Sequence, residues 1–138
     1  MHYAILCYND ENAVAAWTRE EDDACMARLA EVEARMAAKG RLGPVARLQP
    51  TTAAATLRKT PTGAMIVDGP FAETKEQFLG FFVADCDTLD DAIAFAKDLA
   101  IAHPAVGAYE IRPLAIFKPN TITAGATSPR LAAVGAAE

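Results

Sequence analysis

The stretch that decides the fold is Gln77-Phe78-Leu79-Gly80-Phe81-Phe82-Val83-Ala84, a run without a charged side chain. Successive side chains of a strand point to opposite faces, so the run divides into two sets, and both sets are apolar. The sets are Leu79, Phe81, Val83 and Phe78, Phe82, Ala84. The run therefore predicts a strand that is buried on both faces.

Two amphipathic helices accompany this strand. Thr18 and Glu21 form a capping box that predicts the start of a helix over residues 18–39. Its apolar residues recur every three or four positions, and Gly40 predicts its end. Thr88 with Asp91 opens a second helix in the same way. The apolar stripe of this second helix is Ala92, Phe95, Ala96 and Leu99.

Further strands are predicted at residues 3–8, 46–49, 55–59, 64–67 and 108–116, and residues 9–17 are interpreted as a connector. Thr60-Pro61-Thr62-Gly63 indicates a hairpin turn. The order β-α-β-β-β-α-β, with extra short strands in the middle, indicates two split β-α-β units. We therefore expect a ferredoxin-like α+β domain over residues 1–117, followed by a tail at 118–138 that is rich in Ala, Gly, Thr and Pro.

Two helices cover only one face of such a sheet, yet the strand at residues 3–8 is also apolar on both sides. A bare apolar face promotes aggregation, so something must cover it. One candidate is an identical subunit packed sheet against sheet about a twofold axis. The alternative is the tail, folded back over the sheet. We expect the homodimer.

Composition excludes several classes of protein. Apolar residues make up 52% of the 138 residues and the net charge is −5, which excludes global disorder. The 13 basic residues are scattered, which argues against nucleic-acid binding, and no apolar run is long enough to cross a membrane. Three distant cysteines indicate reduced thiols and a cytoplasmic location. With two histidines and no Cys-x-x-Cys motif, we expect no metal site and no cofactor.

The segment Asp68-Gly69-Pro70-Phe71-Ala72-Glu73-Thr74-Lys75-Glu76 holds most of the candidate chemistry. Gly69 and Pro70 form a rigid corner that fixes the directions of the flanking carboxylates. Strand alternation would place Glu73 and Lys75 on the face of Leu79. The segment is then either a polar cluster at the rim of an apolar pocket or a hairpin loop with solvated charges.

Two further residues have both a functional and a structural interpretation. His103 could act as a general base oriented by Asp68, or it could interact with carbonyl groups at the end of the second helix. Arg112 could bind an anion, or it could form an ordinary ion pair with Glu110. Ser128 is the only serine, which argues against a Ser-His-Asp hydrolase.

The segment Val67-Asp68-Gly69-Pro70-Phe71-Ala72-Glu73-Thr74-Lys75-Glu76-Gln77, followed by Gly80-Phe81-Phe82, resembles the signature of the DGPF-domain proteins of the YCII-related superfamily. The resemblance covers roughly residues 1–116 and implies a dimeric α+β barrel of two ferredoxin-like subunits. It also implies a bacterial protein with a functional link to an extracytoplasmic-function sigma factor. Some relatives carry a His-Asp pair in a cleft that eliminates chloride from a hydroxylated aromatic ring, and the matching pair here would be Asp68 and His103.

Two functions follow as expectations. The first is a homodimer that binds a small organic ligand and catalyses cofactor-free proton abstraction or elimination. In it His103 moves a proton, Asp68 orients His103, and Arg112, Lys75, Glu73 and Phe71 contact the ligand. The second is a non-catalytic accessory or sensor protein that works with a sigma factor.

Overall fold

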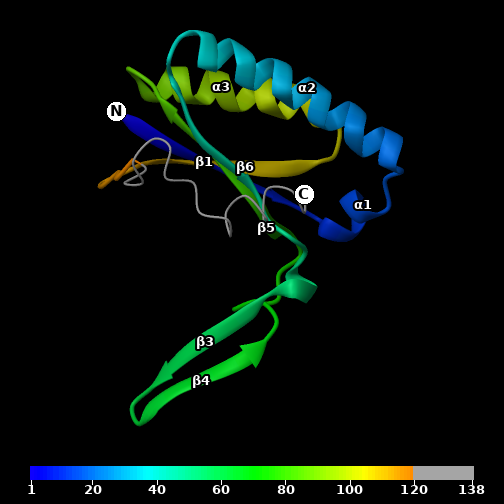
Figure 1. The fold of residues 1–138 in the computed structure, drawn as a ribbon, viewed down its shortest axis with the longest axis vertical. Coiled ribbons are helices and arrows are strands. Elements are labelled where there is room, and N and C mark those ends of the chain that lie inside the picture. The colour runs from blue at the N-terminus through cyan, green and yellow to red at the C-terminus, as the bar shows by residue number, and fades with distance from the viewer. Residues whose placement is uncertain (120–138) are drawn as a thin grey trace, which may run out of the picture.

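The computed structural model describes residues 1–119 and contains a four-stranded antiparallel sheet covered on one face by two helices (Figure 1). The strand order in the sheet is β2-β5-β1-β6. Its strands are β1 (His2–Asn9), β2 (Leu42–Arg47), β5 (Gln77–Asp85) and β6 (Gly107–Pro113). The covering helices are α2 (Arg19–Ala38) and α3 (Leu89–Ala102). The predicted ferredoxin-like α+β fold is confirmed.

Both helices begin where their caps predict. The Thr18 hydroxyl oxygen accepts a hydrogen bond from the Glu21 N–H, and the Thr88 hydroxyl oxygen accepts one from the Asp91 N–H, both at 3.1 Å. Each bond satisfies an amide that has no partner within the helix. The predicted stripe of α3 is fully buried, and α2 buries Cys25, Leu29 and Val32.

The core lies between the helices and the sheet. Ile5 of β1 and Leu99 of α3 have no exposed surface, and the rings of Phe82 and Phe95 meet edge to face with their centroids 6.1 Å apart. Three successive residues of β5 are buried, namely Phe82, Val83 and Ala84. Because neighbours on a strand face opposite ways, β5 is buried on both faces, as its composition predicts.

A hairpin of β3 (Ala55–Thr60) and β4 (Gly63–Asp68) projects from the sheet, and we call residues 55–68 the arm (Figure 1). The strands of the arm pair with each other and belong to no other sheet. The side chains of Leu57, Met65 and Ile66 are 58%, 51% and 64% exposed. The hairpin turn at residues 60–63 is confirmed.

Three local predictions need correction. The connector at residues 9–17 includes a short helix, α1 (Glu11–Ala15), which Asp10 caps by accepting a hydrogen bond from the Asn12 N–H. The strand expected at 46–49 lies earlier, as β2, and includes Pro44. A proline there is tolerated because β2 is an edge strand with an irregular register between Leu42 and Val45. The last strand ends at Pro113 rather than at residue 116.

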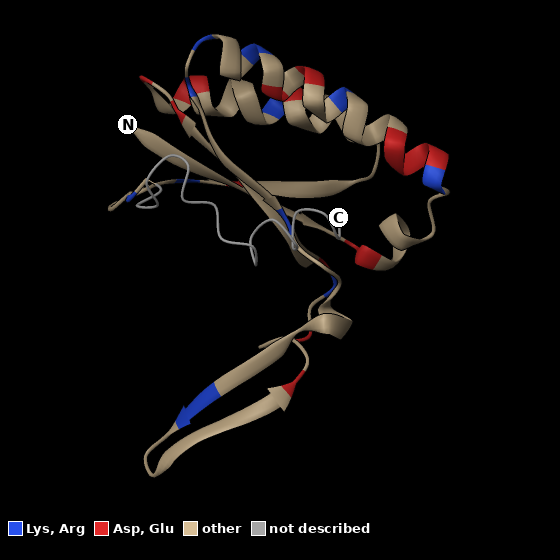
Figure 2. Ribbon diagram, in the orientation of Figure 1, with Lys and Arg blue, Asp and Glu red and all other residues tan. Residues whose placement is uncertain are grey.

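Basic and acidic residues are dispersed along the ribbon (Figure 2). Acidic side chains occupy the first turn of α2, where the helix dipole favours them. Among the described residues, no helix has the length and apolar character needed to span a bilayer. The predicted tail lies outside the described residues, apart from its first two positions.

Candidate functional site

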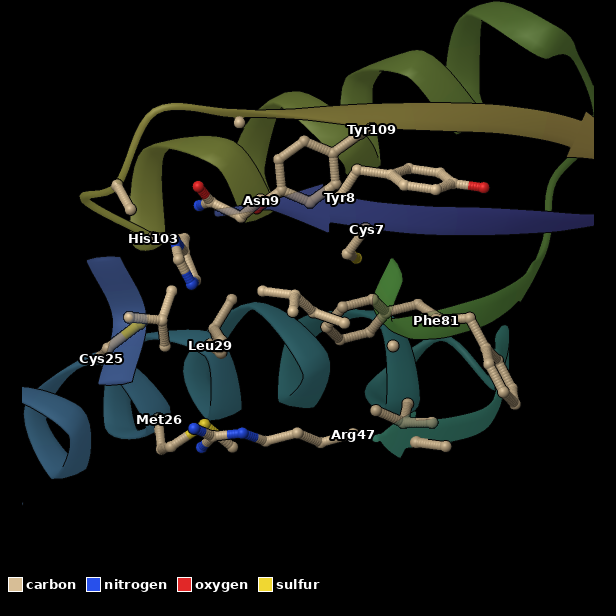
Figure 3. Close-up of a pocket in the computed structure, with 18 of the residues that line it drawn as sticks. Cys7, Tyr8, Asn9, Cys25, Met26, Leu29, Arg47, Phe81, His103 and Tyr109 are labelled. Carbon is tan, nitrogen blue, oxygen red and sulfur yellow. The ribbon is translucent and has the colours of Figure 1, made fainter. Parts of the chain in front are cut away.

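A cavity of about 110 Å³ lies between the helix-covered face of the sheet and helix α2 (Figure 3). Its walls are mainly apolar, and the side chains of Cys7 and His103 point into the space between the strands and α2 (Figure 3). The volume is of the order of the ~150 Å³ apolar cavity that accepts one benzene ring. The largest apolar side chains of the wall are Trp17, Met26, Leu29, Leu79, Phe81 and Phe82.

Glycines allow the strands around this cavity to approach closely. The pairing of β1 with β5 shifts register between Cys7 and Tyr8. Gly80 of β5 lies opposite Cys7 at this shift, and a Cβ on Gly80 would collide with the carbonyl oxygen of Ala46 on β2. On the other side, a Cβ on Gly107 would lie 2.5 Å from the carbonyl oxygen of Tyr8. Only glycine leaves room for the neighbouring backbone at these two points.

His103 is half-buried in the cavity, at the C-terminal end of α3. Its backbone N–H donates to the Leu99 carbonyl oxygen at 3.1 Å, and its ring centroid lies 5.1 Å from that of Trp17. Burial lowers the pKa of His103 below 6.5; the positive charges of Arg47 and Arg28 add to this, and Asp22 opposes it. The imidazole is therefore held in its neutral form at pH 7, in which one ring nitrogen can accept a proton.

Two thiols and one phenol of the cavity wall stay protonated at neutral pH. Burial raises the pKa of the Cys7 thiol to about 12 and that of the Tyr109 hydroxyl to about 12. Burial also raises the pKa of Cys25. At neutral pH these groups carry no charge, which fits an interior suited to an apolar ligand.

An ion pair lies at the outer side of the cavity. Arg47 of β2 donates from both terminal nitrogens to Asp22 of α2, at 3.0 and 3.2 Å. Both side chains also line a second, larger cavity of about 490 Å³, which extends along residues 48–50 to Glu11. The pair therefore lies between the inner apolar cavity and an outer groove lined by both polar and apolar side chains.

Asn9 is the one buried polar residue among the described residues, at 6% exposure. It ends β1 and lines the cavity, and its side-chain oxygen accepts a hydrogen bond from the Asp10 N–H at 2.8 Å. Its side chain thereby connects the end of β1 to the start of α1.

Of the six residues predicted for the site, His103 alone lines the cavity. Asp68 ends β4 at the base of the arm, which projects away from α3 (Figure 1). Within one subunit the structure therefore does not bring Asp68 and His103 together. Arg112 forms an ion pair with Glu110 at 3.0 Å, which is the structural alternative that the sequence predicts for this residue.

The remaining predicted residues lie in the loop between β4 and β5. The strand alternation expected for Glu73 and Lys75 is not observed, because β5 begins at Gln77 and both residues are exposed before it. Phe71 is 73% exposed, and its ring lies under the guanidinium of Arg58 at 5.6 Å. At the corner Gly69 has a φ of 110°, a conformation that favours glycine, although a Cβ there would meet no other atom.

Sequence reasoning missed Arg47, Asp22 and Asn9. Asp22 looked like an ordinary acidic residue of a helix first turn, and Arg47 like a strand residue 25 positions away. No local pattern links the two. Asn9 carried a weak signal, as an amide directly after a wholly apolar strand.

Comparison with known proteins agrees with the motif. A family model described as the YCII-related domain matches residues 1–118. An uncharacterized protein of Rhizobium meliloti (strain 1021) is 55% identical over 122 residues, which are 88% of this chain and 98% of that protein.

Proposed function

The chain belongs to the YCII-related family, and we propose that it binds a small organic ligand in the cavity between β1 and α2, with His103 as the proton acceptor. The observation that carries this proposal is a half-buried histidine, held neutral, at the wall of an otherwise apolar cavity. Apolar pockets with a few converging polar groups are the usual form of small-molecule sites.

The proposed reaction is proton abstraction. A neutral ring nitrogen of His103 takes a proton from a C–H or O–H of the ligand, and the electron pair stays on the ligand as an enolate or phenolate. If the ligand carries a leaving group beside that carbon, the pair forms a double bond as the group departs with its own electrons. Neither step changes an oxidation state of the protein, so neither needs an electron acceptor.

The experiment follows both binding and proton transfer. A panel of phenols and small organic acids is screened by thermal shift, and each ligand that binds is incubated in D₂O with the protein while its proton signals are followed by NMR. We expect exchange of an acidic C–H of the ligand with wild type and no exchange with His103→Gln.

His2→Gln is the matched control, because His2 lies at the other end of β1, stacked on Phe117 with ring centroids 4.4 Å apart. Wild-type exchange in His103→Gln, or a panel without a single binder, would contradict the proposal.

We also propose the homodimer expected from the two apolar faces of the sheet, and we place the exposed arm of each subunit against the second copy of the chain. Both strands of the arm are exposed along almost their whole length, and an isolated two-stranded hairpin is marginally stable in water. A role for Asp68 at the cavity would require such an arrangement, because its own subunit keeps it on the arm.

Sedimentation at micromolar concentration tests the dimer. We expect a dimer for the wild type and a monomer for the pair Leu57→Asp and Ile66→Asp, with Thr62→Asp at the hairpin turn as the control. A monomeric wild type would contradict the dimer without affecting the proposal for the cavity.

A second candidate function is that of a non-catalytic accessory or sensor protein linked to an extracytoplasmic-function sigma factor. This function is favoured because the ring of His103 lies beside the Trp17 ring and not beside a carboxylate that could orient it for proton transfer. Ligand binding without proton exchange would favour this function. Co-elution of the purified chain with an extracytoplasmic-function sigma factor would support the proposed partner. The three free cysteines support the proposed cytoplasmic location.

A further inference from the structure

The guanidinium of Arg47 lies where it can bind the polar end of a ligand. Arg47, Asp22 and Met26 line both the inner cavity and the outer groove. Figure 3 shows Arg47 on the α2 side of the space, across from Cys7 and the strand β1. A ligand that fills the inner cavity and extends outward therefore passes this side chain.

Arg47 has hydrogen-bond donors that its ion pair with Asp22 does not use. A guanidinium carries five N–H groups, and the two hydrogen bonds to Asp22 use two of them. The side chain of Arg47 is 53% exposed, so the remaining donors are accessible. Each terminal nitrogen of Arg47 bonds to a different oxygen of Asp22, which fixes the plane of the guanidinium group. Less entropy is therefore lost when this group binds a second acceptor.

Arg28 and Arg47 lie at this end of the cavity, and the carboxylates of Glu11, Asp22 and Asp23 line the outer groove beside it. Arg28 of α2 is held there by the bond from its Nε to the Ala102 carbonyl oxygen at 2.8 Å. The positive charges of Arg28 and Arg47 lower the pKa of His103, and the negative charge of Asp22 raises it. Glu33 also lines the cavity, and burial raises its pKa.

We propose that Arg47 is the residue that selects the ligand, by binding the carboxylate of a small acid whose ring or short apolar chain occupies the inner cavity. This inference rests on the proposed function of the cavity and names its ligand class. The carboxylate takes the free N–H edge of Arg47, and Asp22 keeps the guanidinium in place. Planar, two-pronged recognition of carboxylates is the interaction that arginine provides and lysine does not.

The experiment compares an acid with its neutral isostere. Benzoate and benzamide are titrated separately into the full-length protein, and dissociation constants are measured by NMR chemical-shift changes. Wild type is expected to bind benzoate about 10- to 100-fold more tightly than benzamide, the range for a charged hydrogen bond. Arg47→Met should remove this preference while benzamide binding stays, and Arg47→Lys should retain only part of it.

Arg19→Met is the matched control, because Arg19 lies at the start of the same helix α2, is 95% exposed and lines neither cavity. Equal binding of both probes to wild type would overturn the inference and leave the proposed cavity intact. A preference that survives in Arg47→Met would also overturn it. Failure of both probes to bind at millimolar concentration would overturn the inference and the proposed function together.

Discussion

Replacing Gly107 with alanine tests the link between the tight strand packing and the cavity. In register, Gly107 of β6 lies opposite Asn9 of β1. A Cβ at this position would lie 2.5 Å from the Tyr8 carbonyl oxygen and 3.0 Å from the side-chain amide of Asn9. Ordinary contacts begin at 3.4 Å, so the backbones must separate by about 0.9 Å. No side-chain rotation relieves this, because the first collision is with backbone.

The expected cost is that of overpacking, about 1–3 kcal/mol in the free energy of unfolding. At about 0.25 kcal/mol per degree for ~120 ordered residues, the melting temperature should fall by about 4–12 °C. Because Tyr8 and Asn9 line the cavity, benzoate binding should weaken as well. Calorimetry and NMR titration measure the two effects.

Gly40→Ala is the control for this substitution. Gly40 has a φ of 68° and open space around its Cα, so alanine there costs about 1–2 kcal/mol of backbone strain and should leave binding unchanged. A Gly107→Ala protein that melts within about 1 °C of wild type would refute the collision.

Three further outcomes are expected. Burial lowers the pKa of His103 in the folded chain, so the unfolded chain binds a proton at this residue more tightly. The free energy of unfolding should therefore fall as the pH drops below 6.5, and it should fall less in His103→Gln. Urea unfolding at a series of pH values measures this difference. Equal pH dependence in both proteins would contradict this. Leu99→Ala should cost about 2–5 kcal/mol because Leu99 is fully buried, and a loss below about 1 kcal/mol in calorimetry would refute its place in the core. The raised pKa of Cys7 predicts slow alkylation by iodoacetamide at pH 7.5, whereas modification as fast as that of free cysteine would disprove its burial.

The fold was predictable because its signals are local. Thr18 and Thr88 carry the caps of the two long helices, and the run at residues 77–84 shows by composition alone that β5 is buried on both faces. Helix ends and strand periodicity depend on neighbours within a few residues, which a sequence displays directly.

The site was less predictable because distant segments form it. His103 was identified as a titratable group beside a helix end, but its neighbours Trp17 and Arg47 come from other elements. The conspicuous motif around Asp68 pointed elsewhere, since its glycine corner ends the arm rather than lining the cavity. A motif marks a constrained backbone, and the constraint alone does not tell which cavity the segment faces.

The most direct test of the account is a crystal structure of the protein with 4-bromobenzoate, in which anomalous scattering locates the bromine. We expect one bromine peak inside the cavity, between Cys7 and Leu29, with the carboxylate on Arg47. A peak on the surface away from these residues, or a cavity without a peak at saturating ligand, would contradict it.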